Sequence, residues 1–477
     1  MSKHAIHFGE KVGYSLGDVG ANLAFQMMMI YQLKFYTDVF GLDGAVAGLV
    51  LLIAPFITAF ADPLAGILAD RTHTRWGKYR PWLLWTALPF CVFYVLAFTN
   101  PGIRQPALVA FYAAITYILL LSVYSFNNTP YSSLGGVMTA DVQERTSINT
   151  IRFVATSVAQ FVVQGLTLPL VDHFGHGNAQ RGWTITVVLF ALLALGCFLI
   201  AFLTTHERIS PPARQRMSIR RDISETFTCK AWIVMFCLTL LLFVSLALFG
   251  SGMNYYFESY VDPYSLARFL NRIGLGTTEN EAYSIGFSLF NTVNAVVQLL
   301  GVLLLSGYLA RRYGKKTTFI VCLFLTSLFT ALFYLPTGHD VLLIFLLGIL
   351  KSLSYAPTIP LLWAMIADVA DYMEYQNHRR ATGFCFSGIV FALKIGLGIG
   401  GALAGIVLSG FGYQPGGALI QSASASQGIR IVASLIPALL FAAGLLVLLR
   451  YPISKQYNEN MQAELASRRE LENHTQP

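Results

Sequence analysis

Residues 183–204 read WTITVVLFALLALGCFLIAFLT, a run of 22 residues that contains no Asp, Glu, Lys or Arg. An α-helix rises about 1.5 Å per residue, so about 20 apolar residues cross the ~30 Å hydrocarbon core of a bilayer. Runs of this kind recur along the whole chain, which has 477 residues, 55% of them hydrophobic and only 12% charged. The mean hydropathy is +0.59. This pattern predicts an all-α polytopic membrane protein.

The low charge content excludes several classes of protein. Soluble proteins carry about a quarter charged residues, and half that density argues against a soluble enzyme, a secreted disulfide scaffold or a single-anchor receptor. The chain has 32 basic and 24 acidic residues, a formal net charge of +8. We assign this excess to cytoplasmic loops, where Lys and Arg accumulate, and expect no nucleic-acid partner. The six cysteines show no CxxC spacing, so we expect neither a metal site nor a cofactor.

Twelve spans are predicted where apolar runs lie between charged and Pro- or Gly-containing breaks. The longest polar stretch separates six of them from the other six. The chain therefore divides into an N-terminal six-helix bundle at 1–205, a cytoplasmic central loop at 206–230, a C-terminal six-helix bundle at 231–452 and a cytoplasmic tail at 453–477. The predicted spans are 14–37, 45–70, 81–99, 106–134, 149–171, 183–204, 231–258, 284–309, 317–336, 341–370, 381–410 and 429–450.

Loop charges predict the orientation in the membrane. The loop after the second span contains Arg71, Arg75, Lys78 and Arg80, and the loop after the eighth contains four basic residues at 311–316. Several of the alternate loops have few basic residues or none. By the positive-inside rule both termini lie in the cytoplasm. The segment 262–283 then lies outside, and its length is compatible with a short surface helix.

The two basic loops also resemble each other. Gly66-x-x-Ala69-Asp70-Arg71 in the first half parallels Gly307-x-x-Ala310-Arg311-Arg312-x-Gly314-Lys315-Lys316 in the second. Equivalent motifs half a chain apart are typical of transporters built from two related bundles. The motif resembles the loop motif of the major facilitator superfamily, which implies two six-helix bundles around a central path.

Five further motifs narrow the resemblance to one family, the glycoside–pentoside–hexuronide:cation symporters, which include the melibiose and glucuronide permeases. The resemblance implies cation-coupled sugar symport by alternating access in the bacterial inner membrane. The expected partners are a small sugar, a coupling cation and the lipid bilayer, with one chain as the functional unit. The motifs are Tyr14-Ser-Leu-Gly-Asp18, Phe35-Tyr-Thr-Asp38, Ala61-Asp62-Pro63, Arg75-Trp-Gly-Lys-Tyr-Arg-Pro81 and Ala367-Asp368-Val-Ala-Asp371-Tyr372.

Asp62 is the strongest candidate for coupling, because a charge inside a span is costly and therefore a functional candidate. Either it is neutralised by a nearby base or it binds the coupling cation, and the resemblance implies the second role. Sodium-using relatives have another Asp where this chain has Thr58. One carboxylate with Thr58 and Ser125 makes a weak sodium site, whereas a proton needs only one basic oxygen. We therefore favour a proton and leave sodium open.

Lys394 lies within an apolar stretch of the eleventh span, Phe391-Ala-Leu-Lys394-Ile-Gly. Its ammonium cannot reach the membrane surface from mid-helix, so a buried partner is expected, and Asp62 in the other bundle is the natural candidate. The glycines that follow, at 396–405, are expected to allow close helix packing.

The candidate sugar-binding residues suggest an acidic substrate. Arg152 is either an interface anchor or, as the resemblance implies, part of the sugar cavity, where its planar guanidinium suits hydroxyls or a carboxylate. Galactoside-carrying relatives have Asp at the positions of Asn22 and Asn128, and a stacking Trp at that of Ser132. Two amides do not repel an anion, so Arg152 and Lys394 would leave the cavity net positive. A hexuronide or a sulfonated sugar such as sulfoquinovose would then fit, although neutral glycosides and pentosides stay open.

Other polar residues have two interpretations each. Asp18 either faces the cavity or pairs with a buried base, and Trp363 either stacks on a sugar or packs against its neighbours. A set of charges near the cytoplasmic ends is expected to form inner-gate salt bridges, with Arg379 and Arg380 opposite the acids of the tenth span. This gate set comprises Asp141, Glu144, Arg145, Asp368, Asp371, Glu374, Arg379 and Arg380.

Three functions other than symport fit the sequence less well. A membrane enzyme would need a metal cluster, a P-loop or a nucleophile–base pattern, and the sequence contains no such motif. A carrier of amphiphilic lipids would have a less polar cavity than these residues predict. A sugar sensor that transports nothing stays open, although no signalling domain is recognisable.

Overall fold

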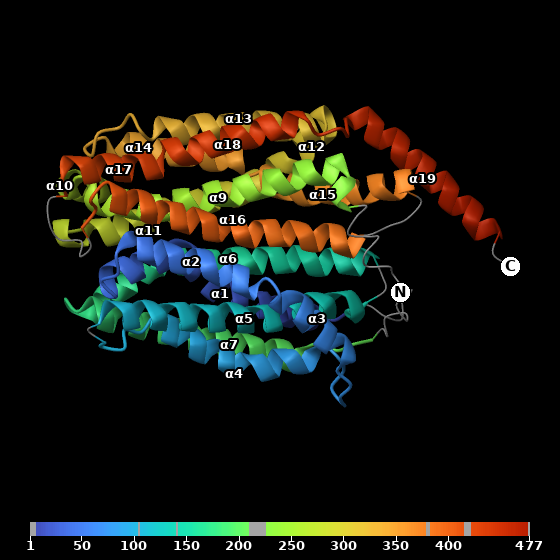
Figure 1. Ribbon diagram of the computed structural model, residues 1–477, viewed down its shortest axis with the longest axis horizontal. Helices are drawn as coiled ribbons and strands as arrows, with labels where there is room; N and C mark the ends of the chain where they lie inside the picture. Colours follow the sequence, from blue (N-terminus) through green and yellow to red (C-terminus); the bar gives the residue numbers. More distant parts are fainter. Residues whose placement is uncertain are drawn as a thin grey trace.

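The computed structural model describes residues 6–103, 105–139, 142–208, 226–377, 382–414 and 421–475. Over these residues the chain forms α-helices, interrupted by short π-helical turns and loops, and no strand beyond an isolated bridge between Thr74 and Gly77. The long helices run roughly parallel to one another (Figure 1). Both chain termini lie at the same end of the molecule (Figure 1).

The described residues of the first half form six membrane-crossing rods, two of which consist of consecutive segments. Helix α1 continues into the π-helical turn η1, and α2 and α3 together make one broken span. The elements are α1 (Phe8–Lys34), η1 (Phe35–Val39), α2 (Gly44–Thr58), α3 (Ala61–Arg71), α4 (Arg80–Ala97), α5 (Pro106–Met138), α6 (Val142–Gly175) and α7 (Ala179–Thr204).

The second half repeats this plan with more interruptions. Three rods consist of consecutive segments, α11–η2–α12, α14–α15 and α17–α18, and α10 is the short helix expected within 262–283. The elements are α9 (Lys230–Ser259), α10 (Pro263–Arg272), α11 (Glu279–Gly301), η2 (Val302–Ser306), α12 (Gly307–Tyr313), α13 (Lys315–Leu332), α14 (Val341–Tyr355), α15 (Thr358–Asn377), α16 (Thr382–Gly410), α17 (Ala423–Ala433), α18 (Leu435–Leu449) and α19 (Lys455–Thr475).

Two features differ from the sequence prediction. Eleven stretches of the described chain are long and apolar enough to cross a membrane, and α1 is not one of them. Polar residues along α1, among them Asp18, Asn22 and Gln26, reduce its hydropathy. Nevertheless α1 packs against α6, α7 and α9 and completes the twelve predicted rods. The segment 453–477, predicted only as a tail, contains helix α19, which points away from the bundles (Figure 1).

Glycines bring the two halves together between α2 and α16. A Cβ atom on Gly405 would lie 2.0 Å from the carbonyl oxygen of Gly44, and one on Gly48 would lie 2.8 Å from that of Ala402. Only glycine permits backbones to approach this closely. The expectation that the α16 glycines serve packing is therefore confirmed at this seam. A second contact joins α6 to α11.

The break between α2 and α3 lies directly before Asp62. Pro55 lies inside α2, and the helix ends at Thr58 before α3 begins at Ala61. Proline removes a backbone donor and clashes with the preceding turn, which favours such an interruption. Discontinuous helices near the middle of a membrane are where transporters place binding sites. The break thus puts Asp62 in the first turn of a new helix.

Candidate transport site

The predicted ion pair between the halves is present. The Lys394 ammonium, from α16, donates to Asp62 Oδ2 and, at 3.2 Å, to Ser125 Oγ on α5. The Thr129 hydroxyl donates to the other oxygen, Asp62 Oδ1, at 3.4 Å. The side chains of Lys394 and Asp62 are only 21% and 28% exposed. Asp62 is therefore bound by one charged and one neutral donor.

Thr58 and Ser125 occupy different places around this pair. The Thr58 hydroxyl donates to the carbonyl oxygen of Ala54 at 2.9 Å, within its own helix. Ser125 contacts the base of the pair rather than the acid. Thr129 contacts the acid and was missed, because its place one helical turn beyond Ser125 becomes informative only when α3 and α5 are known to be neighbours.

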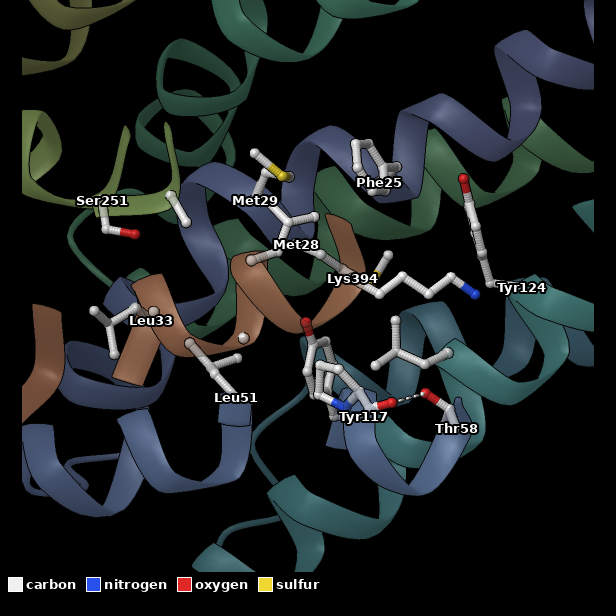
Figure 2. Close-up of a pocket in the computed structure, with 16 residues that line it drawn as sticks. Phe25, Met28, Met29, Leu33, Leu51, Thr58, Tyr117, Tyr124, Ser251 and Lys394 are labelled. Carbon is white, nitrogen blue, oxygen red and sulfur yellow. Dashed lines mark hydrogen bonds between the residues drawn. The ribbon is translucent and has the colours of Figure 1, made fainter. Parts of the chain in front are cut away.

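A small cavity of about 70 Å³ lies beside the pair, between α1, α2, α5, α9 and α16. Figure 2 shows the Lys394 side chain extended across it toward Tyr124, with Thr58 on the wall. Phe25, Met28 and Met29 of α1 form much of the remaining lining. We refer to this space as the Lys394 cavity.

A second ion pair ties Asp18 of α1 to Arg152 of α6. Arg152 Nε lies 2.5 Å from Asp18 Oδ2. Asn22 Nδ2 donates to Asp18 Oδ1 at 3.2 Å, and the guanidinium lies over the Tyr131 ring at 5.3 Å. Of the two interpretations of Asp18, pairing with a base is the one that the structure has.

These two pairs correct the predicted charge of the cavity. Arg152 and Lys394 were expected to leave it net positive, but each is neutralised by an acid, Asp18 and Asp62 respectively. The physical reason is that an uncompensated charge inside a membrane protein is costly, so a base here is matched by the nearest carboxylate. Arg152 and Lys394 therefore do not give the cavity a net positive charge in this conformation.

The other predicted sugar-binding residues, Asn128, Ser132 and Trp363, take no part in the two ion pairs described above. Asn128 Oδ1 is buried without a hydrogen-bond partner, which leaves it available to a ligand. Ser132 is exposed. Trp363 stacks on Phe386 of α16, with ring centroids 6.4 Å apart and planes 10° apart. Packing therefore accounts for Trp363.

Two of the predicted gate residues, Glu144 and Asp368, have described ion pairs that lie within one half each. Lys11 Nζ lies 2.7 Å from Glu144 Oε2 in the first half, and Lys315 Nζ lies 2.7 Å from Asp368 Oδ2 in the second. Asp371 accepts from Gln462 of α19 at 2.8 Å, and Glu374 lies on the same helix, α15. Asp141, Arg379 and Arg380, and the side chain of Arg145, lie outside the described residues.

Asp368 thus corrects part of the gate prediction. The sequence predicts a pair with the arginines at 379 and 380, but the turn between α12 and α13 brings Lys315 to Asp368. The carboxylate receives two hydrogen bonds from Lys315 Nζ, both at 2.7 Å. Its described contact therefore stabilises the second half rather than closing the path between halves.

Besides the Asp62–Lys394 pair, a described charged contact between the halves lies at the opposite end, where α1 ends and α9 ends. Lys34 pairs with Asp38 of η1 at 2.7 Å and with Glu258 of α9. Thr37 shares a 3.0 Å hydrogen bond with Tyr255 of α9. We call these residues the Lys34 cluster. The sequence prediction did not include it, although Lys34 and Asp38 close the first predicted span.

A larger cavity, of about 230 Å³, lies between the halves on the other side of Phe25 and Met29. Lys351 of α14 lines it and was also missed. The sequence does indicate Lys351 as a candidate, because this lysine interrupts the apolar stretch Leu-Gly-Ile-Leu-Lys351-Ser-Leu. Lys394 interrupts the apolar stretch of the eleventh span in the same way. We refer to this space as the Lys351 cavity.

Comparison with known proteins gives a consistent picture. The family model described as MFS/sugar transport protein matches residues 13–455. The chain is 31% identical to the putative glycoside/cation symporter YagG of Escherichia coli (strain K12), over 98% of this chain and 97% of that protein. It is 31% identical to the isoprimeverose transporter of Lactiplantibacillus pentosus, over 99% and 94%. It is 28% identical to the glucuronide carrier protein homolog of Escherichia coli (strain K12), over 97% and 96%.

Solved structures support the fold. The crystal structure of the nucleoside transporter NupG superimposes with a TM-score of 0.61 over 92% of this chain and 99% of that one, at 16% identity. At such low identity the match supports the arrangement of the helices and gives no information about the substrate.

Proposed function

The chain belongs to the MFS/sugar transport protein family, and from this premise we propose that it is a cation-coupled sugar symporter that works by alternating access. It is a multi-pass membrane protein and a secondary transporter rather than an enzyme. The proposal includes the bacterial inner membrane as its location, both termini in the cytoplasm, and a single chain as the transporting unit. On this orientation the Lys34 cluster closes the outer end.

The observation that carries the proposal is the ion pair between Asp62 and Lys394. It joins the two halves at mid-membrane, where alternating access needs a contact that can break. While Lys394 is bound, its ammonium occupies the place beside the carboxylate that a coupling cation would take. A cation on Asp62 therefore competes with Lys394, and the freed base becomes available to the sugar. Sugar affinity and cation affinity then depend on each other by linkage.

A proton is the coupling ion that these surroundings favour. Sodium needs several oxygen ligands, and the described donors at Asp62 are an ammonium and one hydroxyl. The Thr58 hydroxyl is directed to its own helix. Protonation needs no ligand set, because neutralising the carboxylate is enough to release Lys394.

We propose an acidic sugar or glycoside, a hexuronide or a sulfonated sugar, as the substrate. Asn22 and Asn128 offer hydrogen bonds without repelling an anion. The glucuronide carrier homolog among the relatives supports this class. In this scheme the Arg152 guanidinium moves from the Asp18 carboxylate to the sugar. The Asn22 amide, which also contacts Asp18, turns to the sugar with it.

A neutral glycoside is the second candidate. The pairing of Arg152 with Asp18, and of Lys394 with Asp62, favours it because neither base is free in this conformation. The relative named as an isoprimeverose transporter agrees with a glycoside of this kind.

Uptake by proteoliposomes tests the proposal. Purified protein is reconstituted, and accumulation of a radiolabelled hexuronide and of its neutral parent sugar is measured under an imposed pH gradient, an imposed sodium gradient, or neither. We expect accumulation that needs the pH gradient. Accumulation with sodium alone would contradict proton coupling, and saturable binding without uptake under any gradient would identify a sensor.

A further inference from the structure

Part of the wall of the Lys351 cavity is polar, and both halves contribute to that part. Helices α1 and α6 supply Gln26, Gln160 and Gln164, while α11 and α14 supply Asn291, Asn294 and Lys351. The spacing of the α11 residues puts them on one helical face, together with Gln298 one turn further on. Carboxamides donate and accept hydrogen bonds at once, as the hydroxyl groups of a sugar do. The cavity therefore has the chemistry of a carbohydrate site.

Lys351 lies deep within its membrane-spanning segment, and no carboxylate among the described residues is its counter-ion. It is the eleventh residue of α14, about 15 Å from the start of the helix and thus about halfway across the bilayer core. The residue is 6% exposed, and its ammonium lies 4.0 Å from the centre of the Phe249 ring. Within the described chain it has no ion pair with any carboxylate. Lys34 and Lys394 each have at least one.

Other polar atoms around the cavity are also unsatisfied. Asn291 Nδ2, Asn294 Oδ1 and Tyr355 Oη are buried without hydrogen-bond partners. Buried polar groups are normally paired, and leaving them unpaired costs free energy. Gly348 allows Asn294 to lie close to α14, because a Cβ atom there would be 2.9 Å from Asn294 Nδ2. The arrangement holds donors and acceptors ready for a ligand.

We propose that the Lys351 cavity binds the acidic group of the transported sugar, with the Lys351 ammonium against the carboxylate or sulfonate and Asn291 and Asn294 on neighbouring oxygens. The inference rests on the proposed function and names the base that recognises the anion. A volume of about 230 Å³ is below the ~300–1,000 Å³ of sites for drug-sized ligands, so it suits one sugar ring. Phe25 and Met29 line this cavity and the Lys394 cavity, and so place the sugar next to the coupling pair.

Binding of two matched probes tests this assignment. Affinities of methyl β-D-glucuronide and methyl β-D-glucoside are measured by calorimetry for the wild type, Lys351→Met, Lys351→Arg and Lys230→Met. The last variant makes the same chemical change at an exposed residue. We expect Lys351→Met to weaken the glucuronide about 10- to 150-fold, because a charge-assisted hydrogen bond is lost. The glucoside should change little, Lys351→Arg should recover much of the loss, and Lys230→Met should resemble the wild type.

A steric variant tests the location independently of charge. A Cβ atom on Gly250, which lines the cavity, would meet no atom within 4 Å. Gly250→Leu therefore fills the space without disturbing the helix packing, and should weaken both probes while Lys351 is intact. Gly250→Leu keeps every charge, so it still tests the location of the site if Lys351→Met does not fold.

The outcomes separate this inference from the proposed function. If the wild type prefers the glucuronide but Lys351→Met loses both probes equally or neither, the Lys351 assignment is wrong and acidic-sugar transport stands. Unchanged glucuronide binding by Gly250→Leu would also overturn the assignment. If the wild type prefers the glucoside, the acidic substrate and the Lys351 assignment both fail, while the uptake experiment still decides whether the protein is a symporter.

Discussion

At the scale of single residues, three lysines within the membrane have different surroundings. Lys34 is bound by two carboxylates, Lys394 by one, and Lys351 by none within the described chain. The energetic cost of a buried charge makes each arrangement informative. A doubly bound lysine holds helices together, and a singly bound one can be displaced from its carboxylate by a coupling cation. A lysine with no described partner can bind an anion from outside, as proposed for Lys351.

Thr58 is expected to decide the choice of cation. Thr58→Asp puts a second carboxylate near Asp62 and Lys394, which supplies the additional oxygens and negative charge that sodium needs. We expect sugar uptake by this variant to respond to a sodium gradient. The measurement is initial uptake rate against sodium concentration at fixed pH. Thr58→Asn, similar in size and uncharged, is the control, and an equal response of the two variants would exclude a charge effect.

The Asp18–Arg152 pair is expected to be interdependent. Arg152→Gln leaves the Asp18 carboxylate nearly buried without its base, which should cost about 1–3 kcal/mol of stability. Asp18→Asn in the same chain should recover most of the loss, because two amides can hydrogen-bond to each other. Thermal unfolding in detergent of the wild type, both single variants and the double variant measures the coupling. Additive losses in the double variant would contradict a direct pair.

At the scale of elements, the glycine seam between α2 and α16 sets how closely the halves approach. A Cβ atom on Gly405 would lie 2.0 Å from the Gly44 carbonyl oxygen, whereas one on Gly410, at the end of the same helix, would meet nothing. The broken spans are the complementary feature. The break between α2 and α3 puts Asp62 in the first turn of α3, while the seam keeps α2 beside α16, the helix of Lys394.

Gly405→Ala is expected to destabilise the arrangement described here. Overpacking of this kind costs about 1–3 kcal/mol when neighbours cannot move, and here the neighbour is backbone. We expect a lower melting temperature and easier labelling of an introduced cysteine at Thr37, which lies in the Lys34 cluster. Gly410→Ala should leave both measurements unchanged. Equal behaviour of the two variants would show that the seam is not closely packed in the membrane.

At the scale of the whole molecule, apolar runs between charged breaks, together with the loop motifs, predicted twelve rods in two halves. They include α1, which is not among the eleven described stretches that satisfy a stricter hydropathy criterion. Pairing of Asp62 with Lys394 was predictable because each buried charge requires a partner. Contacts of Asp62, Lys34 and Asp368 with Thr129, Glu258 and Lys315 were not predicted, because the sequence does not single out these partners among other polar residues. Their proximity depends on helix rotation and tilt, which a single sequence does not report.

The charges also suggest how the whole molecule moves. Described ion pairs between the halves lie at mid-membrane and in the Lys34 cluster, whereas Lys11–Glu144 and Lys315–Asp368 each lie within one half. On the proposed orientation, this conformation is closed toward the outside. Release of the mid-membrane pair by a cation and a sugar would then let the halves rotate about the glycine seam.

The central claim is that Asp62 couples sugar movement to a cation, and one comparison tests it most directly. Wild type and Asp62→Asn are reconstituted in the same lipid, with Asp340→Asn, at an exposed loop carboxylate, as the matched control. Accumulation of the transported sugar under a pH gradient and its exchange at equal concentrations are measured side by side. We expect Asp62→Asn to lose accumulation and keep exchange, because Lys394 is permanently released. Asp340→Asn should accumulate and exchange the sugar as the wild type does. Accumulation by Asp62→Asn at the wild-type level would contradict the account.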